Sequence, residues 1–275
     1  MCIRDSYSIN HTTTFDFDRV PSAAIQRLHL MPPDHAHQKV IEWAIELSGS
    51  KIELETTDHH GNIVHLGRHD MTSHSVSIHC QGIIDVTDAN GIVGAHDNAL
   101  PLVLYENPSR FSGFGPRTRK LADKVMAGRE AEDEADLMVL HRLSRSVLDH
   151  ITYEKGKTDV TTTAEQALEA GAGVCQDHVH VFCAVARLLG FKARYVSGYL
   201  MMDDTTIQDA SHAWAEVHVD ALGWVGFDIS NSISPDDRYI RLATGFDYAD
   251  VIPVSGVRVG DGNESMSTRI VVEQQ

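Results

Sequence analysis

The first hundred residues alternate between apolar and polar positions in short runs, and turn-forming residues separate these runs. The runs are rich in β-branched and aromatic side chains, which favour strands. They cover residues 7–18, 25–31, 40–48, 62–69 and 74–85. In the third run, every second position is apolar, as in a half-buried strand: Ile41, Trp43, Ile45 and Leu47. The DHHGN stretch at 58–62 has the composition of a hairpin turn. We therefore expect a small antiparallel β domain over residues 7–105.

After a connection rich in proline and glycine at 106–117, the apolar period changes to that of a helix. Apolar and small residues recur at helical spacing at Leu137, Leu140, Ser144, Val147, Leu148 and Ile151. Thr163 and Gln166 form a capping box that starts a short helix, and the next helix runs from Cys175 to Gly190. Strand-like segments follow at 191–201, 212–219 and 224–230. The pattern predicts an α+β core over residues 117–272.

Composition and charge narrow the classes of partner. Of the 275 residues, 42% are hydrophobic and 23% are charged, which is typical of a soluble globular protein. A formal net charge of −16 argues against binding to nucleic acid or to an anionic membrane. The start of the chain, MCIRDSYSIN, has no hydrophobic core of a signal peptide, so we expect a cytoplasmic protein. Residues 1–6 carry no periodicity, and we assign no element to them.

The four cysteines, at positions 2, 80, 175 and 183, are too few and too irregularly spaced for a disulfide framework. Cys175 and Cys183 would lie about 12 Å apart along one helix. That separation exceeds the limit of about 7 Å for a disulfide bridge. Free thiols are expected.

Cys175 allows three interpretations. It begins an apolar helical stripe made up of Cys175, Val179, Phe182, Ala186 and Leu189, so it can be a core residue. It also lies in the first turn of its helix, where unpaired backbone N–H groups and the helix dipole stabilise a thiolate. The glycines before it would let a substrate backbone come close. Cys183 lies in the middle of the helix without these features, and we assign it to the core.

The third interpretation, a metal site made of Cys175, His178 and His180, is disfavoured. Residues two apart on a helix point about 200° away from each other, so the two histidines cannot converge on one ion. No second Cys/His cluster has the spacing of a zinc site. We expect no metal and no cofactor, and we place the other histidines at the surface.

A nucleophilic cysteine needs a histidine base and a group that orients the base. The stretch SHAWAEVHVDALGWVGFDIS offers His212 and Asp228 on two consecutive strands. A turn with an odd number of residues centred on Ala221 would place both side chains on one sheet face, as diagonal neighbours roughly 7 Å apart. A turn of even length would place Asp228 on the opposite face.

Three separated motifs point to a family. GVCQDHVHVFCAVARLLGFKARYVSGYL, SHAWAEVHVDALGWVGFDISNS and DDRYIRLATGFDYADVIPVSGV resemble the bacterial transglutaminase-like superfamily of cysteine proteases over residues 130–272. The N-terminal strands resemble the β domain that precedes this core. The resemblance implies a papain-like triad of Cys175, His212 and Asp228, with the nucleophile at a helix N-terminus packed on an antiparallel sheet. The chain departs from the family at Ile229, where proline is common, and at His178, where an aromatic residue is frequent.

The activity that this resemblance implies is acyl transfer from a peptide or protein substrate through a thioester on Cys175. The backbone N–H of Cys175 would contribute to the oxyanion hole, and Gln176 and Tyr153 are candidates for the second donor. Asp177 and His180 are expected to support the site.

With water as acceptor the protein is a peptidase or amidase, and with a lysine amine it is a transglutaminase. We favour hydrolysis, because water is always available and no feature marks an amine site. A non-catalytic binding module on the same scaffold is the third alternative. The oligomeric state is not indicated by the sequence.

Overall fold

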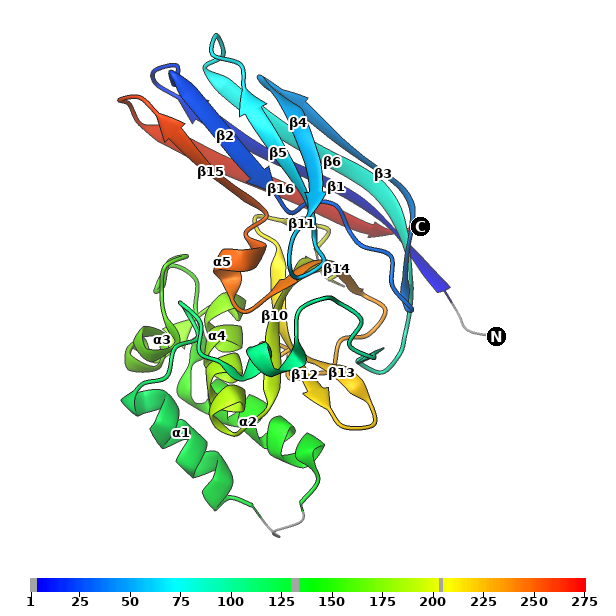
Figure 1. Cartoon of the computed structure of the whole chain (residues 1–275), viewed down its shortest axis with the longest axis vertical. Coiled ribbons are helices and arrows are strands. Elements are labelled where there is room, and N and C mark those ends of the chain that lie inside the picture. The colour runs from blue at the N-terminus through cyan, green and yellow to red at the C-terminus, as the bar shows by residue number, and fades with distance from the viewer. Residues whose placement is uncertain (1–3, 130–133, 203–204) are drawn as a thin grey trace.

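The computed structural model describes residues 4–129, 134–202 and 205–275, which form a β-sheet part and a helical part with its own sheet (Figure 1). In this described chain, three larger antiparallel sheets and one short parallel pair are present. No described helix is long and apolar enough to cross a membrane. The α+β fold class predicted from the sequence is confirmed.

Two of the sheets make up the β-sheet part (Figure 1). The first contains β11 (Ile207–Gln208), β16 (Glu264–Gln274), β1 (Arg4–Phe17), β6 (Ser75–Thr87) and β3 (Gln38–Ser48), in that order. The second contains β15 (Val254–Val259), β2 (Ala23–Leu28), β5 (Ile63–His69) and β4 (Ser50–Thr57). The buried face of the first sheet packs against Leu28 and Leu30 and also against Tyr199 and Leu242 of the third sheet. The two parts of the molecule therefore share a hydrophobic core.

Helices cover the third sheet in the lower part of Figure 1. That sheet contains β14 (Tyr239–Gly245), β10 (Lys192–Leu200), β12 (His212–Val219), β13 (Gly223–Phe227) and β7 (Ile92–Gly94). The helices are α1 (Pro116–Ala127), α2 (Asp136–His150), α3 (Ala164–Ala170) and α4 (Cys175–Leu188), with the short η1 (Leu102–Glu106) and α5 (Tyr248–Val251). Every residue of α4 from 177 to 187 is buried, so this helix is the centre of the core.

Several elements differ from the prediction. β1 begins at Arg4, so residues 4–6, to which we assigned no element, extend the first strand. β4 is an additional strand, and α1 begins inside the predicted connection at 106–117. A bulge between Val40 and Glu42 turns Ile41 out of the half-buried face, which leaves its side chain 55% exposed.

The last two strands return to the first part of the chain. β16 pairs with β1 from Tyr7–Gln274 to Phe17–Glu264, and β15 pairs with β2. The predicted ranges 7–105 and 117–272 therefore separate these strands from the sheets that they complete. Such pairing joins the two ends of the chain and leaves no local periodicity in the sequence. As domain boundaries, the two ranges stay predictions.

Two side-chain amides from the first part of the chain pair with the outer edge of β14. The Gln38 amide accepts a hydrogen bond from the Arg241 N–H (2.8 Å) and donates to the Arg241 carbonyl (3.1 Å). The Asn62 amide does the same with Thr244, at 2.8 Å in both directions. Each amide replaces one residue of a missing neighbouring strand, so the backbone groups of this sheet edge are satisfied.

Many histidines are buried, which corrects the expectation that those outside the 175–180 segment lie at the surface. His11, His29 and His60 are each at most 3% exposed. His11 hydrogen bonds to the Tyr199 hydroxyl at 2.8 Å, and burial lowers its pKa to about 4. A neutral imidazole with hydrogen-bond partners can be buried at little cost, and composition alone does not reveal such partners.

The position of β16 predicts the effect of two substitutions in it. Ile270 is fully buried in the core of the β-sheet part, so Ile270→Ala should lower the free energy of unfolding by about 2–5 kcal/mol. Met266 lies on the same strand but is 62% exposed, and Met266→Ala should change the free energy of unfolding by less than about 0.5 kcal/mol. Urea titration followed by circular dichroism measures both values. Equal, small effects would show that the C-terminal strand is not part of the core.

Candidate active site

Three short elements bring Cys175 to its position. The Thr163–Gln166 capping box predicted from the sequence is confirmed, with the Thr163 N–H donating to Gln166 Oε1 at 2.9 Å. α3 ends at Gly171, whose φ of +65° lies in the left-handed region that glycine adopts readily. The chain then forms β9 (Ala172–Gly173), which pairs in parallel with β8 (Thr152–Tyr153). α4 begins at Cys175, so the thiol lies in its first turn, as predicted.

Asp177 caps the helix that carries Cys175. Its Oδ2 accepts hydrogen bonds from the Val174 N–H at 2.8 Å and from the Thr158 hydroxyl at 2.6 Å. A Cβ added to Gly173 would lie only 2.6 Å from the same Oδ2 atom. Gly173 is therefore required for the cap, whereas the sequence suggested that it makes room for a substrate. Burial raises the pKa of the Asp177 carboxyl.

The hairpin of β12 and β13 has the odd-length turn that the sequence favoured. Its strand pairs run from Ala215–Phe227 to Val219–Gly223, which centres the turn on Ala221. Ala221 has a φ of +67°, and Gly223 follows at +77°. This register extends to place His212 opposite Ser230, with Asp228 as its diagonal neighbour.

The side chains of His212 and Asp228 meet as the register requires. Asp228 Oδ2 accepts a hydrogen bond from His212 Nε2 at 2.6 Å. The same oxygen accepts hydrogen bonds from Asn231 Nδ2 and from the Tyr239 hydroxyl, each at 2.7 Å. The Asn231 backbone N–H donates to the other carboxylate oxygen at 3.1 Å. The carboxylate is 1% exposed but fully hydrogen-bonded, so it can stay ionised in the interior.

The electrostatics of this pair favour a charged imidazole. Burial alone lowers the pKa of His212, but the hydrogen bond to Asp228 and the hydrogen bond and charge of Cys175 raise it to about 10. Burial raises the pKa of Asp228, and its hydrogen bonds and the charge of His212 bring it below the ordinary value. Because Nε2 is bound to Asp228, Nδ1 is the nitrogen left for the thiol. The structure thus brings the three predicted residues together around one imidazole.

Two aromatic residues that the sequence analysis missed support the imidazole. Trp214 stacks on His212 with ring centroids 6.4 Å apart, and Tyr239 lies 6.0 Å from the same ring. Trp214 follows His212 by two positions on one strand, so the spacing was a usable signal. Tyr239 comes from another strand, and nothing local in the sequence marks it.

His178 and His180 face different surroundings. His178 bridges the Ser230 hydroxyl (2.9 Å) and the Ile151 carbonyl (3.1 Å), and burial lowers its pKa. His180 stacks on Phe111 with centroids 5.4 Å apart. Among the described residues, no group of three or more His, Cys, Asp or Glu side chains could hold a metal ion.

The structure separates the two candidates for the second oxyanion donor. The Gln176 side-chain amide donates to the Val160 carbonyl at 3.3 Å, so it is already engaged. Tyr153 is 49% exposed and lines the same cleft as His212.

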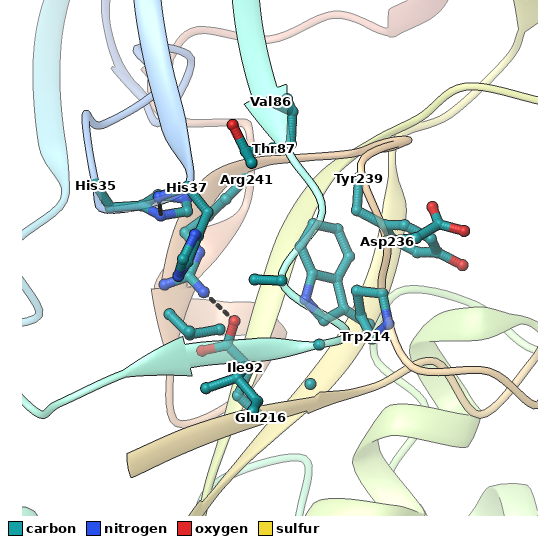
Figure 2. Close-up of a pocket in the computed structure, with 15 residues that line it drawn as sticks. His35, His37, Val86, Thr87, Ile92, Trp214, Glu216, Asp236, Tyr239 and Arg241 are labelled. Carbon is teal, nitrogen blue, oxygen red and sulfur yellow. Dashed lines mark hydrogen bonds and ion pairs between the residues drawn. The ribbon is translucent and has the colours of Figure 1, made fainter. Parts of the chain in front are cut away.

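A cavity lies next to the residues that support His212, and it is smaller than the cleft that Tyr153 and His212 line. Its volume is about 50 Å³, and Figure 2 shows Trp214 and Tyr239 on one side of it and His35 and His37 on the other. A dashed line in Figure 2 marks the ion pair between Arg241 and Glu216, and Glu216 is fully buried. Glu216 also accepts from Arg194 Nε at 2.8 Å, so its charge is balanced on both oxygens.

Comparison with known proteins places these residues in a family. Residues 7–85 match the bacterial transglutaminase-like N-terminal region, and residues 119–229 match the transglutaminase-like superfamily. The chain belongs to the transglutaminase-like superfamily. Members of this superfamily are mostly thiol enzymes. The matched core segment contains Cys175, His212 and Asp228, and it ends before β14 and Tyr239.

Relatives of this transglutaminase-like chain cover almost its whole length. An uncharacterized protein of Mycobacterium tuberculosis is 28% identical over 272 residues, which cover 91% of this chain and 87% of the relative. An uncharacterized protein of Mycobacterium leprae is 24% identical over 282 residues, 96% of each chain. A crystal structure described as "a Putative Cysteine Protease from Cytophaga hutchinsonii" aligns with a TM-score of 0.77 and 19% identity, over 100% of this chain and 93% of that one. It shares the fold.

The three described cysteines should differ widely in reactivity. Burial raises the pKa of the Cys80 thiol to about 12 and that of Cys183 to about 11, and both side chains are inaccessible. Cys175 is partly exposed, beside a charged imidazole. Iodoacetamide at about neutral pH should therefore label Cys175 at least about 100-fold faster, measured by peptide mass spectrometry. Equal rates at the three thiols would falsify the nucleophile assignment. Cys2 lies outside the described residues.

Proposed function

We propose that the protein is a thiol-dependent acyl-transfer enzyme that cleaves peptide or amide bonds, with Cys175 as nucleophile. The observation that carries this proposal is the imidazole of His212, which is 11% exposed, binds Asp228 at 2.6 Å through one nitrogen and lies beside the Cys175 thiol. The position of Cys175 at a helix N-terminus supports the same role, because that position favours a thiolate.

In the proposed reaction, the Cys175 thiolate attacks the carbonyl carbon of the substrate amide. The C–N bond then breaks, and the His212 imidazolium gives its proton to the leaving amine, which leaves a thioester on the enzyme. A water molecule attacks the thioester, gives a proton to His212 and releases the acid and the thiolate. Asp228 keeps the ring in one orientation and stabilises its positive charge. The backbone N–H of Cys175 is the proposed first oxyanion donor.

Hydrolysis is the form of acyl transfer that we favour. Water reaches any open thiol site, and no described residue that lines the cleft beside His212 is a carboxylate that could hold a lysine ammonium group. A transglutaminase, with an amine as acceptor, would use the same thioester. A binding module without catalysis would need neither the ordered carboxylate nor the charged imidazole. The proposed substrate is a peptide or a protein.

A peptide library tests this proposal without knowledge of the natural substrate. The purified protein and its Cys175→Ala variant are each incubated with a proteome-derived peptide mixture that contains lysine peptides. Mass spectrometry should find new peptide termini that depend on Cys175, together with an acyl adduct on Cys175. Isopeptide-linked products in place of new termini would indicate a transglutaminase. A binding module would give the same peptides with both proteins.

Asp228→Asn should lower turnover much more than substrate binding. Asparagine is nearly isosteric, but it carries no charge to stabilise the imidazolium and can hold the wrong histidine tautomer. The loss expected is on the order of 10–10³-fold in kcat, with little change in melting temperature. Tyr239→Phe is the matched control, because it removes one donor to the carboxylate and keeps the charge. Near-normal turnover of the Asp228→Asn variant would reduce Asp228 to a residue at the end of a strand.

The pH profile of the same variant gives a second measurement. Protonated His212 is the acid for the leaving amine, so turnover should fall as the pH rises through its pKa of about 10. Asp228 raises this pKa through its hydrogen bond and its charge, so the alkaline limb should move to lower pH in Asp228→Asn. An alkaline limb at the same pH in both proteins would contradict the coupling between the two residues.

A further inference from the structure

A cleft of about 540 Å³ opens beside His212, and its volume falls in the range of small-ligand sites. Its apolar and aromatic walls come from several segments that the fold brings together. The lining residues are Tyr153, Leu200, Met201, Met202, His212, Ser230, Asn231, Ile233, Arg238 and Tyr239. The inference below rests on the proposed acyl-transfer function and adds the kind of side chain that the site accepts.

Three polar side chains of this cleft are already bound to other parts of the protein. Asn231 Nδ2 donates to Asp228 at 2.7 Å, and the Ser230 hydroxyl pairs with His178 at 2.9 Å. Arg238 forms an ion pair with Asp236 at 2.7 Å. What the described walls offer to a ligand is therefore mainly apolar surface, including Ile233, whose side chain is 38% exposed. Such surface gains free energy when an apolar group covers it.

The position of the cleft relative to the thiol decides which half of a substrate it meets. His212 lines the cleft, whereas Cys175 is absent from its described walls. In acyl transfer, the sulfur binds the acyl carbon and the imidazole gives its proton to the amine nitrogen. The amine half of the substrate must therefore lie on the imidazole side of the thiol. The cleft is on that side.

We propose that this cleft binds a large apolar side chain on the amine side of the scissile amide, that is, of the residue that follows the cleaved bond. The same surface selects among amines that attack the thioester. In that step, the amine nitrogen forms a bond to the thioester carbon, the C–S bond breaks, and His212 takes the proton from the nitrogen. The products are an amide and the free thiolate.

Partitioning of an acyl-enzyme measures this selectivity directly. p-Nitrophenyl acetate acetylates Cys175 and releases p-nitrophenolate, and water or an added amine then removes the acetyl group. The added amines are the α-amides of phenylalanine, leucine, glycine, aspartic acid and lysine. Their N-acetyl products are quantified against acetate by mass spectrometry. Because the ratio of amide to acetate is taken within one protein, differences in overall rate between variants cancel.

Phenylalaninamide and leucinamide should give amide-to-acetate ratios on the order of 10–100-fold above glycinamide and the aspartic amide, because a buried side chain of that size favours the apolar amine. Ile233→Asn should reduce this preference about 3–10-fold. Its backbone pairing with Asp228 does not depend on the side chain, so the loop is retained. Val257→Asn is the matched control, because Val257 lies on β15, is 75% exposed and is no part of the cleft.

The results separate the two proposals. Equal ratios for all five amides, or the highest ratio for lysinamide, would overturn the apolar assignment while the acyl-transfer function stands. An unchanged preference in Ile233→Asn would overturn it too. No p-nitrophenolate burst beyond that of Cys175→Ala would refute the acyl-transfer function itself, and the assignment of the cleft with it.

Discussion

The Oδ2 atom of Asp228 accepts hydrogen bonds from three side chains that come from three segments of the chain, and the candidate site depends on that convergence. His212 begins β12, Asn231 lies in the turn after β13, and Tyr239 begins β14. A buried carboxylate without such donors would be protonated, because burial disfavours its charged form. With them it stays ionised, and its charge in turn keeps the imidazole charged. The two pKa values therefore move apart: Asp228, together with Cys175, raises that of His212, and the hydrogen bonds and the charge of His212 lower that of Asp228.

This convergence makes the β-sheet part relevant to the candidate chemistry, although it contributes none of the three candidate catalytic residues. Tyr239 is carried by β14, an edge strand whose outer backbone groups pair with the side-chain amides of Gln38 and Asn62. Without these amides, the edge would expose unpaired N–H and C=O groups inside the interface between the two parts. The first part of the chain thus holds β14 in position through Gln38 and Asn62. β14 positions Tyr239, whose hydroxyl donates to the Asp228 carboxylate.

Local patterns predicted the features that depend on neighbouring residues. The cap at Thr163 and the hairpin centred on Ala221 follow from spacing within a few positions, and the hairpin register alone brings His212 and Asp228 to one face. Features that join distant segments could not be predicted. Tyr239 and the strands after residue 253 are brought into place by tertiary pairing, which leaves no periodicity in the sequence. The alternation predicted for the third strand holds at Trp43, Ile45 and Leu47 but fails at Ile41, since a bulge is set by the partner strand.

The residue after the carboxylate shows how one local constraint can replace another. In the family pattern that the sequence resembles, proline is common there, and it would fix the backbone φ and hold the chain leaving the strand. Ile229 has no such restriction, but its side chain is fully buried in the core that surrounds α4. On either side of it, Asp228 pairs with Ile233 through two backbone hydrogen bonds of 2.9 and 3.2 Å, and Ser230 is held by His178. The turn is therefore fixed by burial and by hydrogen bonds at both of its neighbours. The histidine at 178, the second departure from the family pattern, supplies one of those bonds, so the two departures belong to one arrangement that keeps the carboxylate in place.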